Sequence, residues 1–196
     1  MTTRRDLLVG AAALLLARQV LAQGQVEQGV RRARGSVQAN REGITTGPDS
    51  EVLFVRGRDA VMVRSNSSLS FVASGFRVLT GAVLAVFSPG QPKELRTPTA
   101  TIGIRGTAVY LEIEPARTYV CTCYGEAVLA ALDSPASRET VRTRAHEQPR
   151  YIMAGGAPQM ITSAPVINHT DAELALLEGL VGRQRPYQSP GTTPRY

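Results

Sequence analysis

The sequence predicts a mainly β protein of layered, short antiparallel strands, arranged as a sandwich or a β-solenoid-like stack, with one helix near the C-terminus. Three observations support this fold class. From residue 35 to about residue 152, Val, Ile, Leu, Thr and Tyr come in short runs separated by Gly, Pro, Asn, Asp and Ser. The 196 residues include 18 Gly and 12 Pro, which favours many short elements joined by turns. Helical periodicity is confined to one segment after residue 170.

Residues 1–22 have the features of an export signal. Arg4 and Arg5 precede an apolar run over residues 7–17, which is too short to span a membrane. The arginine pair, followed by Asp and two Leu, resembles a twin-arginine signal; the general secretory route and an ordinary N-terminal helix are the alternatives. We expect cleavage after Ala22 and a periplasmic protein whose mature chain has no membrane span.

The rest of the chain divides into four segments. Residues 23–34 are polar and are expected to be flexible, and residues 35–155 form the β domain. Residues 156–182 form a C-terminal segment that includes the helix. Residues 183–196 contain three Pro and no apolar pattern, so we expect a disordered tail.

The strands of the β domain are expected between turn residues. They cover residues 51–64 (two strands around the turn at 57–59), 76–87, 99–113, 118–124, 127–132 and 139–145. A short element recurs at Gly35, Gly81 and Gly125, where each Gly is expected to lie in a turn before a strand of small apolar residues. The recurrence suggests repeated hairpin units within one domain.

The helix begins at a capping box, in which Thr170 caps the first turn and Glu173 reaches back. Gly182 is the expected end. The apolar stripe consists of Leu174, Leu177, Leu180 and Val181. Because a helix of about 11 residues is marginal alone in water, we expect it to dock on the β domain near the cysteine-bearing face, with a partner protein as the alternative.

Composition and motifs exclude several classes of function. The net charge of +6 is spread along the chain, the aromatic content is 5% and there is no Trp, so a nucleic-acid surface is not expected. The sequence contains no G-x-S-x-G elbow, P-loop or H-E-x-x-H motif. We therefore expect no enzymatic activity.

Cys121 and Cys123 form the most unusual motif. At positions i and i+2 of a strand, the two side chains point to one face, with Cβ atoms about 6.6 Å apart. A disulfide requires Cβ atoms about 3.8 Å apart, so these cysteines cannot form a disulfide while the strand is extended. An exported protein meets an oxidising compartment, and the thiols must therefore be protected by burial or by a metal.

The turn before this strand sets its register. Pro115 suits a four-residue loop, which pairs Ile113 with Thr118 and places Tyr110 and Glu112 on the face that carries the cysteines. The opposite face is apolar and resembles core. The cysteine face is the more polar one, and it either meets solvent or is covered by the C-terminal segment.

Cys121, Cys123 and His146 would supply three soft ligands for zinc, iron or copper. A fourth ligand would be His169, Glu147 or water. The spacing matches no standard zinc finger or haem-attachment motif, so no cofactor is certain. The alternatives are two buried structural thiols with a surface histidine, and thiol redox chemistry, although a redox pair normally uses C-x-x-C at a helix N-terminus.

Residues 96–110 contain a Thr-Pro-x-Ala segment (97–100), an apolar strand and an Arg-Gly-Thr turn (105–107). With the upstream strand at 76–83, this order of elements resembles the core motif of the FecR domain family, and the resemblance covers about residues 35–132. It implies a periplasmic all-β domain of the kind found in regulators that relay ferric-siderophore signals to a sigma factor. It brings no catalytic residues.

This chain departs from the plan of those regulators, because we identify no cytoplasmic anti-sigma segment and no uncleaved membrane helix. The fold therefore carries over better than the signalling role. We expect an exported, non-enzymatic FecR-like binding or sensing module whose protein or small-molecule ligand is unidentified. The alternative is a metal-binding or thiol-redox protein that uses Cys121, Cys123 and His146.

Overall fold

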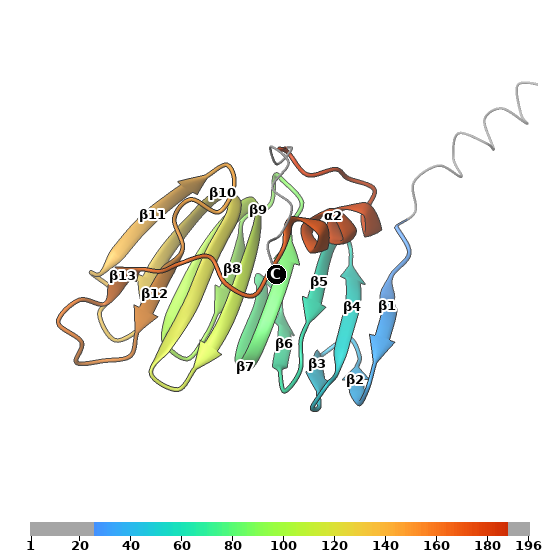
Figure 1. The fold of residues 1–196 in the computed structure, drawn as a ribbon, viewed down its shortest axis with the longest axis horizontal. Coiled ribbons are helices and arrows are strands. Elements are labelled where there is room, and N and C mark those ends of the chain that lie inside the picture. Colours follow the sequence, from blue (N-terminus) through green and yellow to red (C-terminus); the bar gives the residue numbers. More distant parts are fainter. Residues whose placement is uncertain (1–25, 188–196) are drawn as a thin grey trace, which may run out of the picture.

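The computed structural model describes residues 26–187 and shows a mainly β protein with a C-terminal helix, which confirms the predicted fold class (Figure 1). The expected signal peptide lies outside the described residues. The strands are β1 (Gly29–Arg34), β2 (Val37–Ala39), β3 (Gly43–Thr46), β4 (Glu51–Arg56), β5 (Asp59–Val63), β6 (Ser68–Val72), β7 (Gly75–Val86), β8 (Lys93–Arg96), β9 (Ala100–Glu114), β10 (Arg117–Ala131), β11 (Arg138–Thr143), β12 (Arg150–Met153) and β13 (Ile161–Ser163), and the helix is α2 (Asp171–Leu180).

The strands form one hydrogen-bonded sheet that folds into two layers. The front layer contains β1, β4, β5, β12 and β13, and the back layer contains β2, β3, β6, β8 and β11 (Figure 1). The long strands β7, β9 and β10 belong to both layers. The second half of β7 pairs with β5 and β9, for example, whereas its first half pairs with β6 and β8. The architecture is therefore a sandwich whose central strands are continuous between layers.

Two of the recurring glycines mark the places where these strands bend. Gly81 and Gly125 lie inside β7 and β10 with φ of +78° and +92°, so the prediction that they lie in turns is wrong. The pairing of β10 with β9 shifts register between residues 122 and 126, and the strands expected at 118–124 and 127–132 are one strand. A glycine at a bulge explains both observations, because only glycine adopts positive φ without steric cost.

Each recurring glycine has the same hydrogen-bonded surroundings. The amide that follows Gly81 donates to the hydroxyl of Ser67 at 2.9 Å, and the amide that follows Gly125 donates to that of Thr107 at 3.2 Å. A Cβ atom at Gly81 would lie 2.0 Å from the Ser67 oxygen. The repeat in the sequence is thus a repeat of one corner geometry, in which a side chain would displace the hydroxyl.

The Thr-Pro-x-Ala segment has a structural role. The hydroxyls of Thr97 and Thr99 lie 2.9 and 2.7 Å from that of Thr118 in β10, and the amide of Ala100 donates to Thr97 at 3.0 Å. The β9–β10 hairpin has the predicted register, with Ile113 opposite Thr118, but Glu114 also pairs with Arg117, so the loop has two residues and not the predicted four. The motif therefore fixes the start of β9 against β10.

The boundaries of the predicted segments need two corrections. Gly29–Arg34, expected to be flexible, forms edge strand β1, which pairs with β4 through its backbone while its side chains stay largely exposed. At the other end, β13 adds to the sheet at Ile161–Ser163, beyond the expected limit at residue 155. Backbone pairing of a polar edge strand requires no apolar pattern, which explains why the sequence did not indicate β1.

The sheet buries apolar side chains on both faces. Between the layers lies a core that includes Phe76, Leu95, Ile102 and Leu129. The outer face of the front layer is covered by the segment after β13 and by α2, which contacts β5 and β7 (Figure 1). Among residues 26–187, no helix combines the length and apolarity that a membrane crossing requires.

Candidate metal centre

Cys121 and Cys123 lie on the outer face of β10, where both are fully buried free thiols. Their face is covered by the C-terminal segment, so the second of the two expected surroundings is the one found. Tyr119 lies on the same face, and its hydroxyl donates to the carbonyl of Pro165 at 2.9 Å. This bond ties the covering segment to β10 beside the thiols.

His146 reaches the thiols from the loop between β11 and β12. Its amide donates to the carbonyl of Cys123 at 3.0 Å, and its Nδ1 lies 3.4 Å from Sγ of Cys121. The residue has φ of +61°, in the left-handed region. Such a conformation costs of order 1 kcal/mol and often marks a functional position. The loop thus holds the His146 ring against β10 at some cost in backbone strain.

His169 comes from the segment that leads into α2. Its Nε2 lies 2.9 Å from Nδ1 of His146, and its ring stacks on that of Tyr110 with centroids 4.6 Å apart. The capping box predicted for Thr170 and Glu173 is present. The start of the helix therefore places His169 over the outer face of the sheet.

An arginine that directly follows β5 holds this helix start in place. The guanidinium of Arg64 donates to the carbonyl of Asn168 at 3.0 Å and to Glu173 at 2.7 Å. The first turn of α2 is thereby tied to β5 next to His169. As predicted, the helix is docked, with Leu174 and Leu177 fully buried and Val181 3% exposed.

The four candidate ligand atoms of Cys121, Cys123, His146 and His169 all lie within 4.8 Å of one another. Zinc bonds of about 2.3 Å to sulfur and 2.0–2.1 Å to nitrogen separate tetrahedral ligand atoms by about 3.3–3.8 Å. The cluster is therefore close to the size of a tetrahedral site. Small side-chain shifts would bring the four atoms to one ion.

Glu147, one of the three expected choices for the fourth ligand, points away from the cluster. It is exposed, and its carboxylate accepts hydrogen bonds from the amides of Arg144 and Ala145 at 2.8 and 3.0 Å. These bonds lower the pKa of Glu147 against the opposing effect of desolvation. The carboxylate closes its own loop, and the side chain that lies beside the other three candidates is that of His169.

The second nitrogen of each histidine also has a partner. Nε2 of His146 lies 3.2 Å from Asp171 and 2.9 Å from the hydroxyl of Tyr187, which itself donates to Asp171. Nδ1 of His169 lies 2.5 Å from the carbonyl of Ile167. Metal-bound histidines almost always donate their other N–H to a carboxylate or carbonyl, which fixes the ring. Both rings are oriented in this way.

Sequence reasoning did not identify Asp171 as part of the site, because its position in the first helical turn explains it as part of a cap. It also missed Tyr187, which lies in the tail expected to be disordered. Residues 183–187 are instead packed, with Arg183 paired to Glu178 at 2.5 Å. No spacing rule connects Tyr187 to a histidine 41 residues earlier, so the signal exists only in three dimensions.

The thiols and the histidines of the cluster shift one another's pKa values. Hydrogen bonding from the Cys123 thiol, supported by His146 and His169, outweighs burial and lowers the pKa of Cys121 to about 4. Burial and the adjacent Cys121 sulfur raise the pKa of Cys123. Burial lowers the pKa of His146, but the Cys121 sulfur and Asp171 outweigh it, so this pKa is raised overall. At neutral pH the pair of thiols therefore holds one negative charge in a buried site.

No family model matches the sequence, and no curated protein does either. Two crystal structures of a proposed anti-sigma factor from Parabacteroides distasonis resemble this chain with a TM-score of 0.51 and 12% identity, over 70% of the chain. The chain spans 65% and 64% of the length of that protein in the two structures. At this level of identity, the similarity shows that the chain shares the fold of the P. distasonis protein.

Proposed function

We propose that this chain is an exported, non-enzymatic FecR-like sensing module and that its ligand is a zinc ion. The observation that carries the proposal is the convergence of two cysteines and two histidines, whose ligand atoms lie within 4.8 Å of one another. Two further observations support the regulatory part: the motif at residues 96–110 and the fold shared with a proposed anti-sigma factor.

Zinc fits the donor set better than the other metals considered. Two thiolates and two imidazoles in a tetrahedral arrangement are typical of zinc sites. Four protein ligands leave no open position for a substrate, as in structural rather than catalytic zinc sites. The burial of the cluster, with His169 only 9% exposed, also excludes bulk water. The module therefore binds the metal without performing chemistry on a second molecule.

A thiol-redox function has less support. Both cysteines are free thiols at positions i and i+2 of β10, a spacing that in an extended strand keeps the Cβ atoms too far apart for a disulfide. Neither cysteine lies at a helix N-terminus, the usual environment of a redox thiol. A bound zinc ion instead protects the thiolates in an oxidising compartment. Export through the twin-arginine system would allow the metal to be inserted before the folded protein crosses the membrane.

Metal occupancy would act on the C-terminal segment. The ligands come from β10, from the β11–β12 loop and from the start of α2, so one ion links the sheet to the segment that covers it. A ligand that binds only the folded state stabilises it, by about 2.7 kcal/mol when its concentration is 100 times Kd. Zinc would thereby hold α2 on the sheet, and its loss would loosen the helix. This coupling gives the module a metal-dependent state that a partner could recognise.

The test is the metal content of the mature protein, recovered from the periplasmic fraction without chelators. We expect about one zinc ion per chain, and at least a tenfold loss of zinc affinity in Cys123→Ser and in His169→Gln. The matched control is Thr122→Val, because Thr122 lies between the cysteines in β10 and its buried hydroxyl has no partner among the described residues. That variant should keep its zinc.

Three results would count against parts of the proposal. A protein that is purified without metal and does not bind added zinc overturns the metal centre. Iron or copper in stoichiometric amount overturns the assignment to zinc. Absence of the protein from the periplasmic fraction overturns the export, whatever metal it contains.

A further inference from the structure

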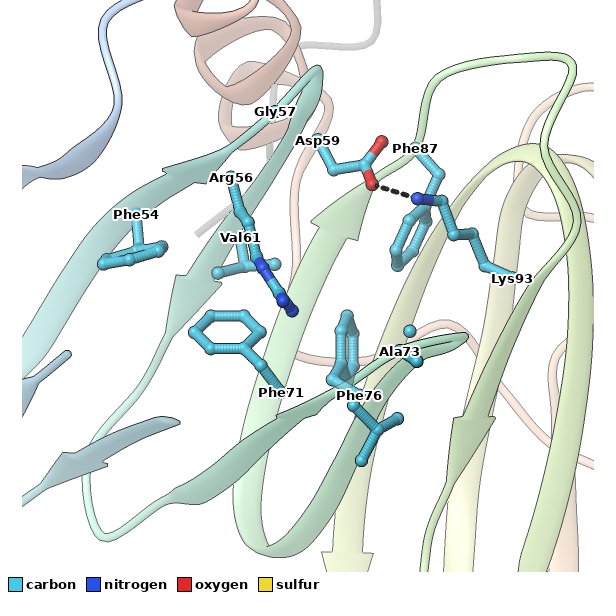
Figure 2. Close-up of a pocket in the computed structure, with 12 residues that line it drawn as sticks. Phe54, Arg56, Gly57, Asp59, Val61, Phe71, Ala73, Phe76, Phe87 and Lys93 are labelled. Carbon is cyan, nitrogen blue, oxygen red and sulfur yellow. Dashed lines mark ion pairs between the residues drawn. The ribbon is translucent and has the colours of Figure 1, made fainter. Parts of the chain in front are cut away.

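A second site lies at one open end of the sandwich, where β4 and β5 face the hairpin between β6 and β7 (Figure 2). It is a pocket of about 270 Å³. All four phenylalanines of the chain line it: Phe54, Phe71, Phe76 and Phe87. Its lining shares no residue with the metal cluster.

The rings form two pairs across the gap between the layers. Phe54 and Phe71 have centroids 5.4 Å apart, and Phe76 and Phe87 have centroids 5.6 Å apart. Figure 2 shows Phe71 and Phe76 side by side, below Phe54 and Phe87. A cavity of about 150 Å³ already accepts benzene, so this pocket has room for an aromatic ring with a short chain.

The rim of the pocket is positively charged. The guanidinium of Arg56 is exposed, lies over the ring of Phe71 at 4.7 Å, and has no acidic partner among residues 26–187. Lys93, the only lysine in the sequence, pairs with Asp59 at 3.0 Å. An adjoining hollow of about 410 Å³ shares Phe54, Arg56 and Phe71 with the pocket and adds Arg41. Three cations and one carboxylate therefore surround the two hollows.

The carboxylate of Asp59 is already occupied. It accepts hydrogen bonds from the amide and hydroxyl of Ser88 at 2.8 and 3.0 Å, in addition to the ion pair with Lys93. Arg56 consequently keeps its hydrogen-bond donors free at the mouth of an apolar cavity. A planar guanidinium of this kind matches a carboxylate with two parallel hydrogen bonds.

We propose that this pocket binds a small aryl carboxylate. Its ring would lie between the two phenylalanine pairs, where offset and edge contacts between aromatic rings add to the burial of apolar surface. Its carboxylate would meet the Arg56 guanidinium at the rim. The site is independent of the zinc centre and gives the module a second, organic ligand.

The test is isothermal titration calorimetry on the full-length protein with 4-phenylbutyrate as the probe. We expect saturable binding, and binding at least about tenfold weaker for the neutral analogue 4-phenylbutanol, since one charge-assisted bidentate contact is lost. Arg56→Gln should weaken binding of the acid by a similar factor. The matched control is Arg77→Gln, because Arg77 is an exposed arginine of β7 that does not line the pocket.

Arg56 is exposed, so its substitution leaves the fold intact and a negative result is informative. No binding of 4-phenylbutyrate up to about 10 mM would overturn the proposal. Equal affinity for the acid and the alcohol would overturn the role of Arg56, as would equal effects of the two arginine substitutions. Tighter binding of decanoate than of 4-phenylbutyrate would overturn the aromatic assignment.

Discussion

The two faces of the front layer of the sheet are both buried, but they use different interactions. The inner face packs against the back layer through aliphatic and phenylalanine side chains, such as Val61, Val83 and Leu111. The outer face carries tyrosines and thiols, and two of its tyrosine hydroxyls have partners in the segment that covers it. Tyr119, for example, donates to the carbonyl of Pro165, and Tyr124 donates to Glu178 of α2.

The difference shows that the inner face mainly stabilises the sandwich, whereas the outer face fixes the position of the C-terminal segment. Apolar contacts between the layers are not directional, so they stabilise the sandwich without fixing any one side chain against another. The hydrogen bonds of the outer face are directional, and leaving a buried partner unpaired costs about 1–3 kcal/mol. The C-terminal segment therefore has one favoured position on the sheet, and that position brings His169 to the cysteines.

The largest effect is expected in the core between the layers. Ile102→Ala removes a fully buried side chain that is enclosed between the layers, and we expect a loss of about 4 kcal/mol in the free energy of unfolding. Urea denaturation with and without zinc measures this loss. Because Ile102 belongs to the core between the layers and not to the cluster under the covering segment, the zinc affinity of the folded variant should be unchanged. A weakened zinc affinity would show that the two faces act as one unit.

A smaller effect is expected on the outer face. Leu177→Ala removes a fully buried side chain of α2, but the helix can settle toward the sheet, so we expect a loss of about 2 kcal/mol in the free energy of unfolding. The shifted helix should also displace His169 and weaken zinc binding by about tenfold.

The control for this helix is Leu176→Ala, since Leu176 is 38% exposed and its substitution should cost less than about 0.5 kcal/mol. Hydrogen exchange of residues 167–187 provides a second readout. If the protection of this segment and its zinc affinity both stay unchanged in Leu177→Ala, the outer face does not position the site.

The sequence was sufficient for most strands, because alternation and turn residues are local signals. The register of the β9–β10 hairpin followed from Pro115 alone and is confirmed. The bends at Gly81 and Gly125 could not be predicted, because a glycine in a turn and one in a bulge leave the same local pattern. Their hydroxyl partners come from other parts of the chain: Ser67 lies just before β6, and Thr107 lies in β9.

Some residues of the candidate site could likewise be predicted from the sequence, and others could not. Two cysteines at positions i and i+2 of a strand can be recognised as candidate ligands, and His146 was a candidate because the sequence contains only two histidines. The choice between His169 and Glu147 depended on how two loops fold, and Glu147 turned out to close its own loop. Asp171 and Tyr187 contact His146 only because α2 docks. Groups that orient a ligand carry no spacing signal, since any segment can supply them.

The smallest expected effect is a pH dependence that belongs to the outer face only. In the metal-free protein, the hydrogen bond from Cys123 and the nearby histidines lower the pKa of Cys121 from near 9 to about 4. A thiol whose pKa is lowered by folding stabilises the protein fully above its ordinary pKa, and this contribution is lost as the pH falls toward 4. The raised pKa of His146 acts oppositely: its contribution is present below about 6.5 and is lost as the pH rises through the raised value.

The two effects separate in pH. Between about pH 5.5 and 6.5 the unfolded state binds one proton more than the folded state, so the free energy of unfolding should rise by about 1 kcal/mol. Above about pH 6.5 the two contributions offset each other until His146 loses its proton, and the curve should level off. Urea denaturation across this range, in the presence of a chelator, measures the slope. Cys121→Ser should abolish this slope, and Thr122→Val should keep it. An unchanged slope in Cys121→Ser would show that the titrating group is not Cys121 and that the outer face does not hold a thiolate.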